Sequence, residues 1–159
     1  MERQEKSNRD QLIPIDSVQG TRTHGANGSD DWVQLLERMM ENAVDIGRFQ
    51  IRFTSTADIN GGFTLSPAKV EALLQITQET FNNIIKHSKA GSVRINMMQN
   101  RSGIILYIFD DGDGFDLQQV KKRSGLANIY AETMRFNGMV DIITAPGYGC
   151  SVTVLIPYD

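Results

Sequence analysis

The chain has 159 residues, with 16 basic and 19 acidic side chains, a formal net charge of −3 and 40% hydrophobic residues. That length suits one ordinary domain whose core needs no metal or disulfide. The single cysteine, Cys150, excludes a disulfide framework and a cysteine-based zinc cluster. No apolar run approaches the roughly 20 residues that span a bilayer, and the slightly acidic balance argues against nucleic acid as the main partner. We therefore expect a domain of the reducing, cytoplasmic compartment that does not itself contact the membrane.

The first 30 residues differ in composition from the rest of the chain. Residues 1–30 are mostly polar, lack aromatic side chains and include a turn-rich stretch at 24–30. We predict a mobile tail or linker there. The folded domain is then predicted to span residues 31–159.

The spacing of apolar residues from Asp31 onward predicts helices and strands in mixed order. They are a helix from about Asp31, a strand at 48–55, a helix from Pro67 to about His87 with Ser66 as N-cap, strands at 93–98 and 104–109, a helix from Gly125 to Asn137, and strands at 140–144 and 151–156. The strand at 104–109 is apolar almost throughout, which predicts a central position. Because hairpin-like connections dominate the second half, we predict a two-layer α/β sandwich: a mixed, mostly antiparallel sheet with helices on one face.

Two segments carry residues that could do chemistry. The helix from Pro67 has a polar stripe opposite its apolar face, formed by Glu79, Asn83, Lys86 and His87. The strand at 104–109 runs directly into an Asp/Gly-rich stretch at 110–116.

An Asp/Gly-rich stretch alone is most often a turn, and two binding schemes for it can be excluded. An EF-hand needs a glutamate at loop position 12, but Lys121 or Lys122 stands there. A dinucleotide fingerprint needs a third glycine, and Leu117 occupies that position. The chain also contains no G-x-x-x-x-G-K-[ST] phosphate loop, so any nucleotide must bind by another scheme.

Four segments in order carry a family resemblance. They are the helix stripe at 79–87, the strand end Asp110-x-Gly112-x-Gly114, the helix start Gly125-Leu126, and Gly147-x-Gly149 before the last strand. In order, spacing and context they resemble the N, G1, G2 and G3 boxes of the GHKL (Bergerat-fold) ATPase superfamily. The chain from about residue 31 to 159 is most similar to the ATP-binding catalytic domain of bacterial sensor histidine kinases of the nitrate-sensor-like transmitter group.

The resemblance implies how the adenine would be recognised. Asp110 matches the aspartate that accepts the exocyclic amino group of adenine; a carboxylate can only accept, so the carbonyl of guanine would be repelled and ATP is expected. Gly112 and Gly114 match glycines at which the backbone turns and approaches the base and ribose. Phe115 and Thr153 are also expected to bind the nucleotide.

The resemblance likewise implies a phosphate and metal site. Asn83 matches the asparagine that holds Mg²⁺ bridging the phosphates, which suits an ion that keeps few protein ligands. Lys86 and His87 are expected to donate to phosphate. Gly125, with Leu126, begins a helix whose amides can donate to phosphate. Glu79 either orients Mg²⁺ or polarises the attacking imidazole, and we leave its catalytic role open.

The sequence departs from the family pattern at two positions. Arg123 replaces the first glycine of the usual G-x-G-L at the end of the ATP lid (116–124), whose other cations are Lys121 and Lys122. Cys150 replaces a threonine whose hydroxyl holds a water near adenine. We expect that contact to be lost or taken over by Ser151 or Thr153.

The implied activity is transfer of the γ-phosphoryl group of Mg·ATP to a histidine on a separate dimerisation domain, with a response regulator downstream. Neither His24 nor His87 has the context of a phosphoacceptor, so the acceptor is expected outside this chain. The resemblance leaves open whether the full-length protein is membrane-anchored. Two alternatives are an anti-sigma-type serine protein kinase and a non-catalytic ATP-binding regulatory module.

Overall fold

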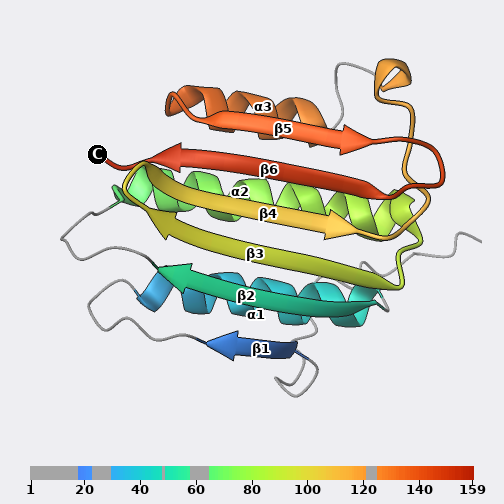
Figure 1. Ribbon diagram of the computed structural model, residues 1–159, viewed down its shortest axis with the longest axis horizontal. Coiled ribbons are helices and arrows are strands. Elements are labelled where there is room, and N and C mark those ends of the chain that lie inside the picture. The colour runs from blue at the N-terminus through green and yellow to red at the C-terminus, as the bar shows by residue number, and fades with distance from the viewer. Residues whose placement is uncertain (1–17, 23–29, 48, 58–64, 121–124) are drawn as a thin grey trace, which may run out of the picture.

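The described part of the chain forms one mixed sheet of six strands. A computed structural model describes residues 18–22, 30–47, 49–57, 65–120 and 125–159. The strand order is β1-β2-β3-β4-β6-β5 (Figure 1). The two pairings among β1, β2 and β3 are parallel and the remaining three pairings are antiparallel. The strands are β1 (Val18–Arg22), β2 (Gln50–Ala57), β3 (Ser92–Asn100), β4 (Gly103–Asp110), β5 (Met139–Thr144) and β6 (Cys150–Pro157).

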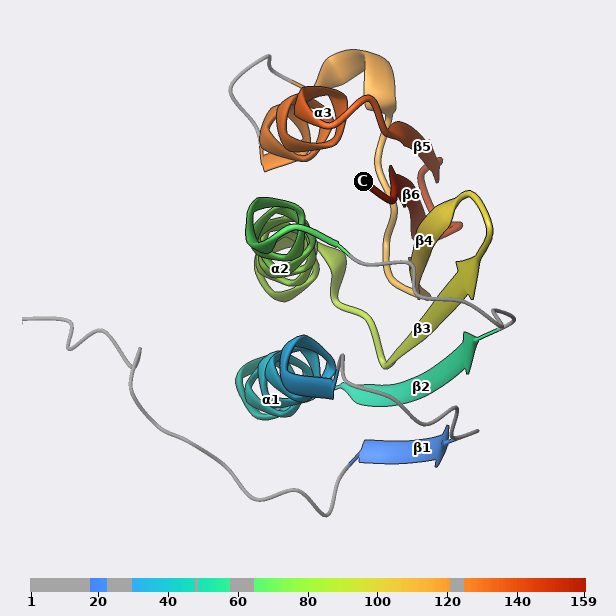
Figure 2. The same ribbon diagram turned by 90° about the vertical axis from the view of Figure 1, so that its left-hand side faces the viewer.

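The helices all cover the same face of this sheet. They are α1 (Asp30–Gly47), α2 (Pro67–Asn83) and α3 (Gly125–Arg135). Figure 2 shows the three side by side in one layer, with the opposite face of the sheet free of described helices. The predicted two-layer α/β sandwich with a mostly antiparallel sheet is therefore confirmed. Among the described residues, no helix has the length and apolar character needed to cross a membrane.

The core lies between the two layers and follows the alternation of the strands. Along β4 the even-numbered residues are buried, ending at Asp110, whereas the odd-numbered residues from Ile105 onward are only partly buried. β4 lies between β3 and β6, so its predicted central position is confirmed. The helices contribute fully buried side chains from the other side, among them Leu36, Met40, Leu73, Ile76 and Ile129.

One strand was not predicted. β1 pairs in parallel with β2, in register from Val18 beside Ile51 to Arg22 beside Ser55. It falls within residues 1–30, for which the sequence predicts a tail or linker. Backbone pairing to an existing edge needs no strong apolar pattern in the added strand, so the composition of this stretch does not reveal it. The remainder of the proposed tail, 1–17 and 23–29, lies outside the described residues, and the domain boundary stays a prediction.

The second helix begins at Pro67 with Ser66 at the N-cap position, as predicted, but ends differently. The side chain of Ser66 makes no capping hydrogen bond. The backbone amide of Ser66 donates to Asp159 Oδ2 at 2.5 Å. At the other end α2 stops at Asn83, and a π-helical turn (Ile84–Ser88) follows, closed by Lys89 in the left-handed conformation. A π-turn widens the helix and changes the direction of the side chains that follow.

Candidate functional site

A cavity of about 250 Å³ opens between the C-terminal half of α2, the loop after β4, the start of α3 and the start of β6. Asn83 and Asp110 both line it, so the two side chains on which the resemblance depends most share one space. Five other residues predicted for the site also line it: His87, Gly114, Phe115, Gly125 and Leu126.

Asp110 is the buried charged group of this cavity. Asp110 is only 4% exposed. Its Oδ1 accepts hydrogen bonds from the Gly112 amide, at 3.0 Å, and from the hydroxyl of Ser88. Burial raises the pKa of the Asp110 carboxyl above its ordinary value, while these two hydrogen bonds act in the opposite direction. The carboxyl therefore occupies a largely dry position in which an acceptor is strong.

The loop that follows Asp110 is fixed on both sides. The Asp113 amide donates to the Ser88 carbonyl at 2.6 Å, and the Asp113 carbonyl accepts from the Gly147 amide at 2.6 Å. Gly112 faces the end of the π-turn: a Cβ there would overlap the Ser88 hydroxyl and carbonyl. We expected the backbone at Gly112 to approach the nucleotide. The structure instead packs Gly112 against Ser88, and Gly112 does not line the cavity.

Gly114 is held in a left-handed conformation. Its φ is +61°, and a Cβ would meet the carbonyl oxygens of Ala145 and Gly149. It lines the cavity, so both parts of its expected role, a sharp turn and a close approach to the site, fit its position.

Glu79, Asn83 and Gly125 meet where α2 faces the start of α3. A Cβ on Gly125 would lie 2.6 Å from Glu79 Oε2 and 3.0 Å from Asn83 Oδ1. Glu79 does not line the main cavity but an adjoining polar groove between the two helices, which also includes Gln75 and Glu132. The Asn83 Nδ2 is buried and has no hydrogen-bond partner among the described residues. The absence of a side chain at Gly125 thus lets the start of α3 pack directly against one carboxylate and one amide.

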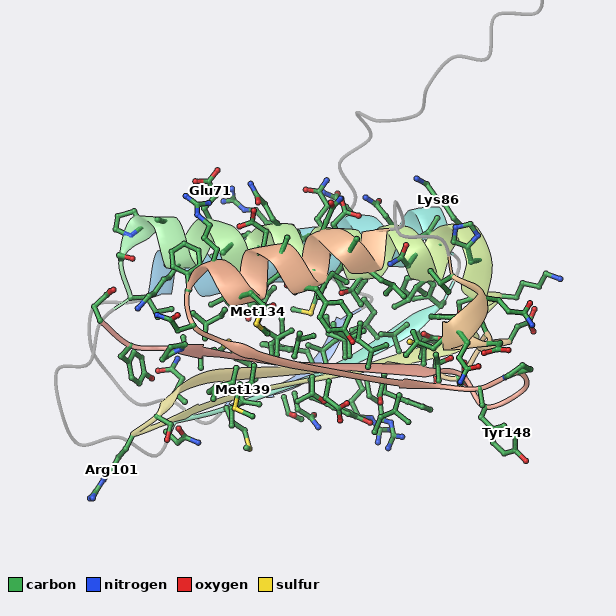
Figure 3. All side chains as sticks on the ribbon, turned by 90° about the horizontal axis from the view of Figure 1, so that it is seen from above. Glu71, Lys86, Arg101, Met134, Met139 and Tyr148 are labelled. Atoms are coloured by element: carbon green, nitrogen blue, oxygen red, sulfur yellow. The ribbon has the colours of Figure 1, made fainter. Side chains whose placement is uncertain are left out.

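The two predicted phosphate-binding cations lie differently. His87 is exposed and lines the cavity. Lys86 is exposed and does not line it; Figure 3 shows its side chain on the outer side of the helix layer, directed away from the sheet. The structure therefore brings His87, but not Lys86, to the cavity.

The last strand divides its residues between the two faces of the sheet. Cys150 and Val152 line the cavity, whereas Thr153 lies on the other face, in register with Tyr107 and Asp141. Our expectation of Thr153 in the nucleotide site is corrected, because alternation along a strand turns it away. Ser151 is on that outer face too, so neither replaces the hydroxyl absent at Cys150. Partial burial, and next the charge of Asp110, raise the pKa of the Cys150 thiol to about 11.

Several residues of the site were missed. The missed residues with hydroxyl groups are Ser88 and the buried Thr80. The missed apolar residues, which form the walls, are Ile84, Ile108, Val120 and Val152. Strand alternation could have found Ile108, two residues before Asp110 on the same face. No comparable signal marks Ser88, because its direction depends on the π-turn. Of the predicted lid, residues 121–124, including Arg123, lie outside the described residues.

This sandwich fold, with a helix asparagine and a buried strand-end aspartate in one cavity, has the architecture of the ATP-binding domain predicted from the sequence. Residues 68–159, more than half of the chain, match the family described as "Histidine kinase-, DNA gyrase B-, and HSP90-like ATPase". The chain belongs to this family.

Curated relatives share the domain over part of their length. The sensor histidine kinase LiaS of Bacillus subtilis is 31% identical over 94 residues, which is 58% of this chain and 26% of LiaS. The signal transduction histidine-protein kinase/phosphatase DegS of Brevibacillus brevis is 32% identical over 93 residues, 57% of this chain and 24% of DegS. The match thus spans about a quarter of the length of these relatives.

Solved structures support the fold. The Acinetobacter baumannii histidine kinase AdeS superposes with a TM-score of 0.60 at 18% identity, covering 80% of this chain and 64% of that one. The histidine kinase domain of the Erythrobacter litoralis EL346 blue-light activated histidine kinase gives a TM-score of 0.58 at 15% identity, with coverage of 79% and 64%.

Proposed function

We propose that this chain is the ATP-binding catalytic domain of a two-component sensor histidine kinase. It would transfer the γ-phosphoryl group of Mg·ATP to a histidine on a separate dimerisation domain. The observation that carries this proposal is the single cavity shared by Asn83 of α2 and Asp110 of β4. The family match and the printed names of the relatives add support.

The cavity suits an adenine base. Ile108, Val152 and Leu126 supply apolar walls for the flat faces of a purine, and buried Asp110 supplies an acceptor at its edge. A carboxylate accepts from the exocyclic amine of adenine but repels the carbonyl that guanine carries at the same position. We therefore assign Asp110 to the selection of ATP over GTP.

The contact beside Gly125 brings together two side-chain oxygens of the kind that bind a magnesium ion. Asn83 Oδ1 and the Glu79 carboxylate both lie beside Gly125, and these oxygens can ligate a metal, whereas the unpartnered Asn83 Nδ2 is a hydrogen-bond donor and cannot. The described residues contain no group of three or more His, Cys, Asp or Glu that could hold a metal by themselves. Mg²⁺ is often bound by one or two protein ligands, phosphates and water, so Asn83 is assigned as its ligand, with Glu79 next to it.

The chemistry asked of this chain is positioning and charge neutralisation, since phosphoryl transfer needs little covalent participation by protein. Asn83 would hold the metal, which would neutralise phosphate charge, and we assign the amides at the start of α3, from Gly125 onward, to the phosphates. His87 lines the cavity as a donor for phosphate. Glu79, in the adjoining groove, is placed to orient the metal or to polarise the incoming imidazole.

The proposal implies two protein partners and a location. The acceptor histidine belongs to the dimerisation domain of a sensor kinase, and a response regulator receives the phosphoryl group afterwards. We place the domain in the cytoplasm. Family membership and the names of the relatives support these partners.

The test is autophosphorylation with γ-labelled ATP, mixing this chain with a histidine-bearing hairpin domain from the same genome. We expect label on the hairpin that is lost in acid, because phosphohistidine is acid-labile. Asn83→Ala should abolish transfer while retaining part of the nucleotide binding, since the base contacts remain.

Two results would contradict the proposal. Label that survives acid would identify a hydroxyl acceptor, as in a serine protein kinase. Mg·ATP binding without transfer to any hairpin, with Asn83→Ala binding as well as the wild type, would indicate a regulatory nucleotide-binding module instead.

A further inference from the structure

Ser88 contacts the most buried charge of the site, yet neither the motifs nor the proposed function gives it a role. It ends the π-helical turn and is 8% exposed. Its hydroxyl donates to Oδ1 of Asp110, the oxygen that also accepts from the Gly112 amide. Within the described part of the chain, the hydrogen bonds to this carboxylate both go to Oδ1, and none goes to Oδ2. The two oxygens of the Asp110 carboxylate therefore differ: Oδ1 accepts two hydrogen bonds and Oδ2 accepts none of them.

The position of Ser88 is fixed through its backbone as well as its side chain. The Ser88 carbonyl accepts from the Asp113 amide at 2.6 Å. Gly112 packs so closely on Ser88 that a Cβ at Gly112 would overlap it. Lys89, left-handed with φ of 53°, ends the turn immediately afterwards. A donor held in this way can fix the orientation of the carboxylate to which it is bonded.

We propose that Ser88 is a positioning residue for nucleotide selection: by donating to Oδ1 it fixes the plane of the Asp110 carboxylate and leaves Oδ2 as the acceptor for the purine amine. The inference rests on the proposed role of Asp110. Without the hydroxyl, the carboxylate would keep a single anchor at Gly112 and could rotate. Its preference for an amine over a carbonyl would then weaken, because the acceptor would no longer be held at one point.

The test compares ATP with inosine triphosphate, which has a carbonyl in place of the adenine amine, by calorimetry on the full chain. For Ser88→Ala we expect the ATP-over-inosine preference to fall about tenfold, the size of one charge-assisted hydrogen bond. Ser88→Thr, which keeps the hydroxyl, should restore most of the preference. The ratio of two affinities measured on the same sample does not depend on the fraction of protein that is folded.

Ser92→Ala is the matched control. The Ser92 hydroxyl donates at 3.0 Å to the neighbouring carboxylate, Asp111, which is exposed and does not line the cavity. The nucleotide preference of this variant should equal that of the wild type.

The outcomes separate this inference from the proposed function. If the wild type itself does not discriminate between the two nucleotides, the adenine role of Asp110 is wrong. If the wild type discriminates but Ser88→Ala keeps the full preference, or loses both nucleotides equally, Ser88 is only structural and the inference alone is overturned.

Discussion

Asp110 and Asp111 are adjacent carboxylates in opposite environments. Burial raises the pKa of Asp110. At Asp111, hydrogen bonds from the Ser92 amide and hydroxyl and from the Gly91 amide lower the pKa and together outweigh the effect of burial, which raises it. The end of β4 places the first side chain in the cavity and the second outside it, so only Asp110 is suited to select a ligand.

We predict that Asp110→Asn removes most of the ATP binding. The amide can present a donor to the adenine amine where the carboxylate presented an acceptor, a penalty of about 1–3 kcal/mol. Calorimetry with Mg·ATP measures the loss, and Asp111→Asn, which changes the exposed neighbour, is the control. Equal ATP affinity for wild type and Asp110→Asn would remove Asp110 from the adenine site.

The raised pKa of Asp110 predicts a pH dependence of nucleotide choice. Protonation removes the charge that selects the amine, so the ATP-over-inosine preference should fall as the pH drops through this pKa, which lies above the ordinary aspartate value of 3.8. Titration of the phosphates affects both nucleotides alike and cancels in the ratio. Asp111→Asn should move the midpoint down, because the charge of Asp111 contributes to raising the Asp110 pKa; an upward shift would contradict this.

The raised pKa of Asp110 affects folding stability in the opposite direction to the nucleotide preference: a higher pH strengthens the preference but lowers the free energy of unfolding. Because the pKa of Asp110 is higher in the folded chain than its ordinary value of 3.8, ionisation is less favourable in the folded state. This group therefore lowers the free energy of unfolding as the pH rises from about 3.8 through the raised pKa. The site keeps a locally unfavourable charge where it is useful for recognition.

At the scale of elements, the site depends on where α2 stops being a regular helix and where α3 begins. The π-turn Ile84–Ser88 directs Ser88 toward Asp110 while His87 lines the cavity. The start of α3 meets α2 at Gly125, between the side chains of Glu79 and Asn83. Two helix ends thus place groups that neither helix could bring together alone.

We predict that Gly125→Ala lowers phosphoryl transfer at least about tenfold while the fold persists. The added Cβ would lie 2.6 Å from Glu79 Oε2 and 3.0 Å from Asn83 Oδ1, and small displacements of catalytic groups have large effects on rate. Alanine itself favours a helix, so far-UV circular dichroism should not change.

The control for this substitution is Gly91→Ala, because a Cβ at Gly91 would meet nothing within 4 Å. Its labelled-ATP transfer rate should match the wild type. Undiminished transfer by Gly125→Ala would show that the close packing of Gly125 against Glu79 and Asn83 is not needed for the reaction.

At the scale of the whole molecule, the fold is a single core between one sheet and one layer of helices. Buried residues of both layers form one cluster, and the outer face of the sheet carries exposed apolar residues such as Met98. Figure 3 shows another, Met139, on the side of the sheet away from the helices. The cavity is the place where the two layers are not closed by side chains, next to the ends of α2 and β4.

We predict that Ile95→Ala lowers the free energy of unfolding by about 2–5 kcal/mol, measured by urea denaturation. Ile95 is 0% exposed in the centre of the sheet, between β2 and β4. The same substitution at Ile143, which is 66% exposed on the edge strand β5, should change it by less than about 0.5 kcal/mol. Similar losses at both positions would contradict the core described above.

The sequence could predict the parts of this protein that repeat a local pattern. Apolar periodicity predicted α1, α2, α3 and the strands β2 to β6, because burial against one partner layer imposes spacings of 3.6 or 2 residues. It missed β1, which joins the sheet through backbone pairing. The motif spacing also placed Asn83, Asp110 and Gly114 correctly at one cavity.

What the sequence by itself determined is therefore the two-layer fold and the residue types that we propose to select a purine and a metal. Only the tertiary structure decided which of those residues share the cavity: it placed Ser88 on Asp110, turned Thr153 to the outer face and put Gly112 against Ser88. The physical reason is that the direction of a side chain is not encoded locally at the end of a helix or strand. Residue identity and spacing fix the chemistry available along a helix or strand, but the facing of each side chain at an element's end depends on the π-turn, the strand register and the packing of distant segments.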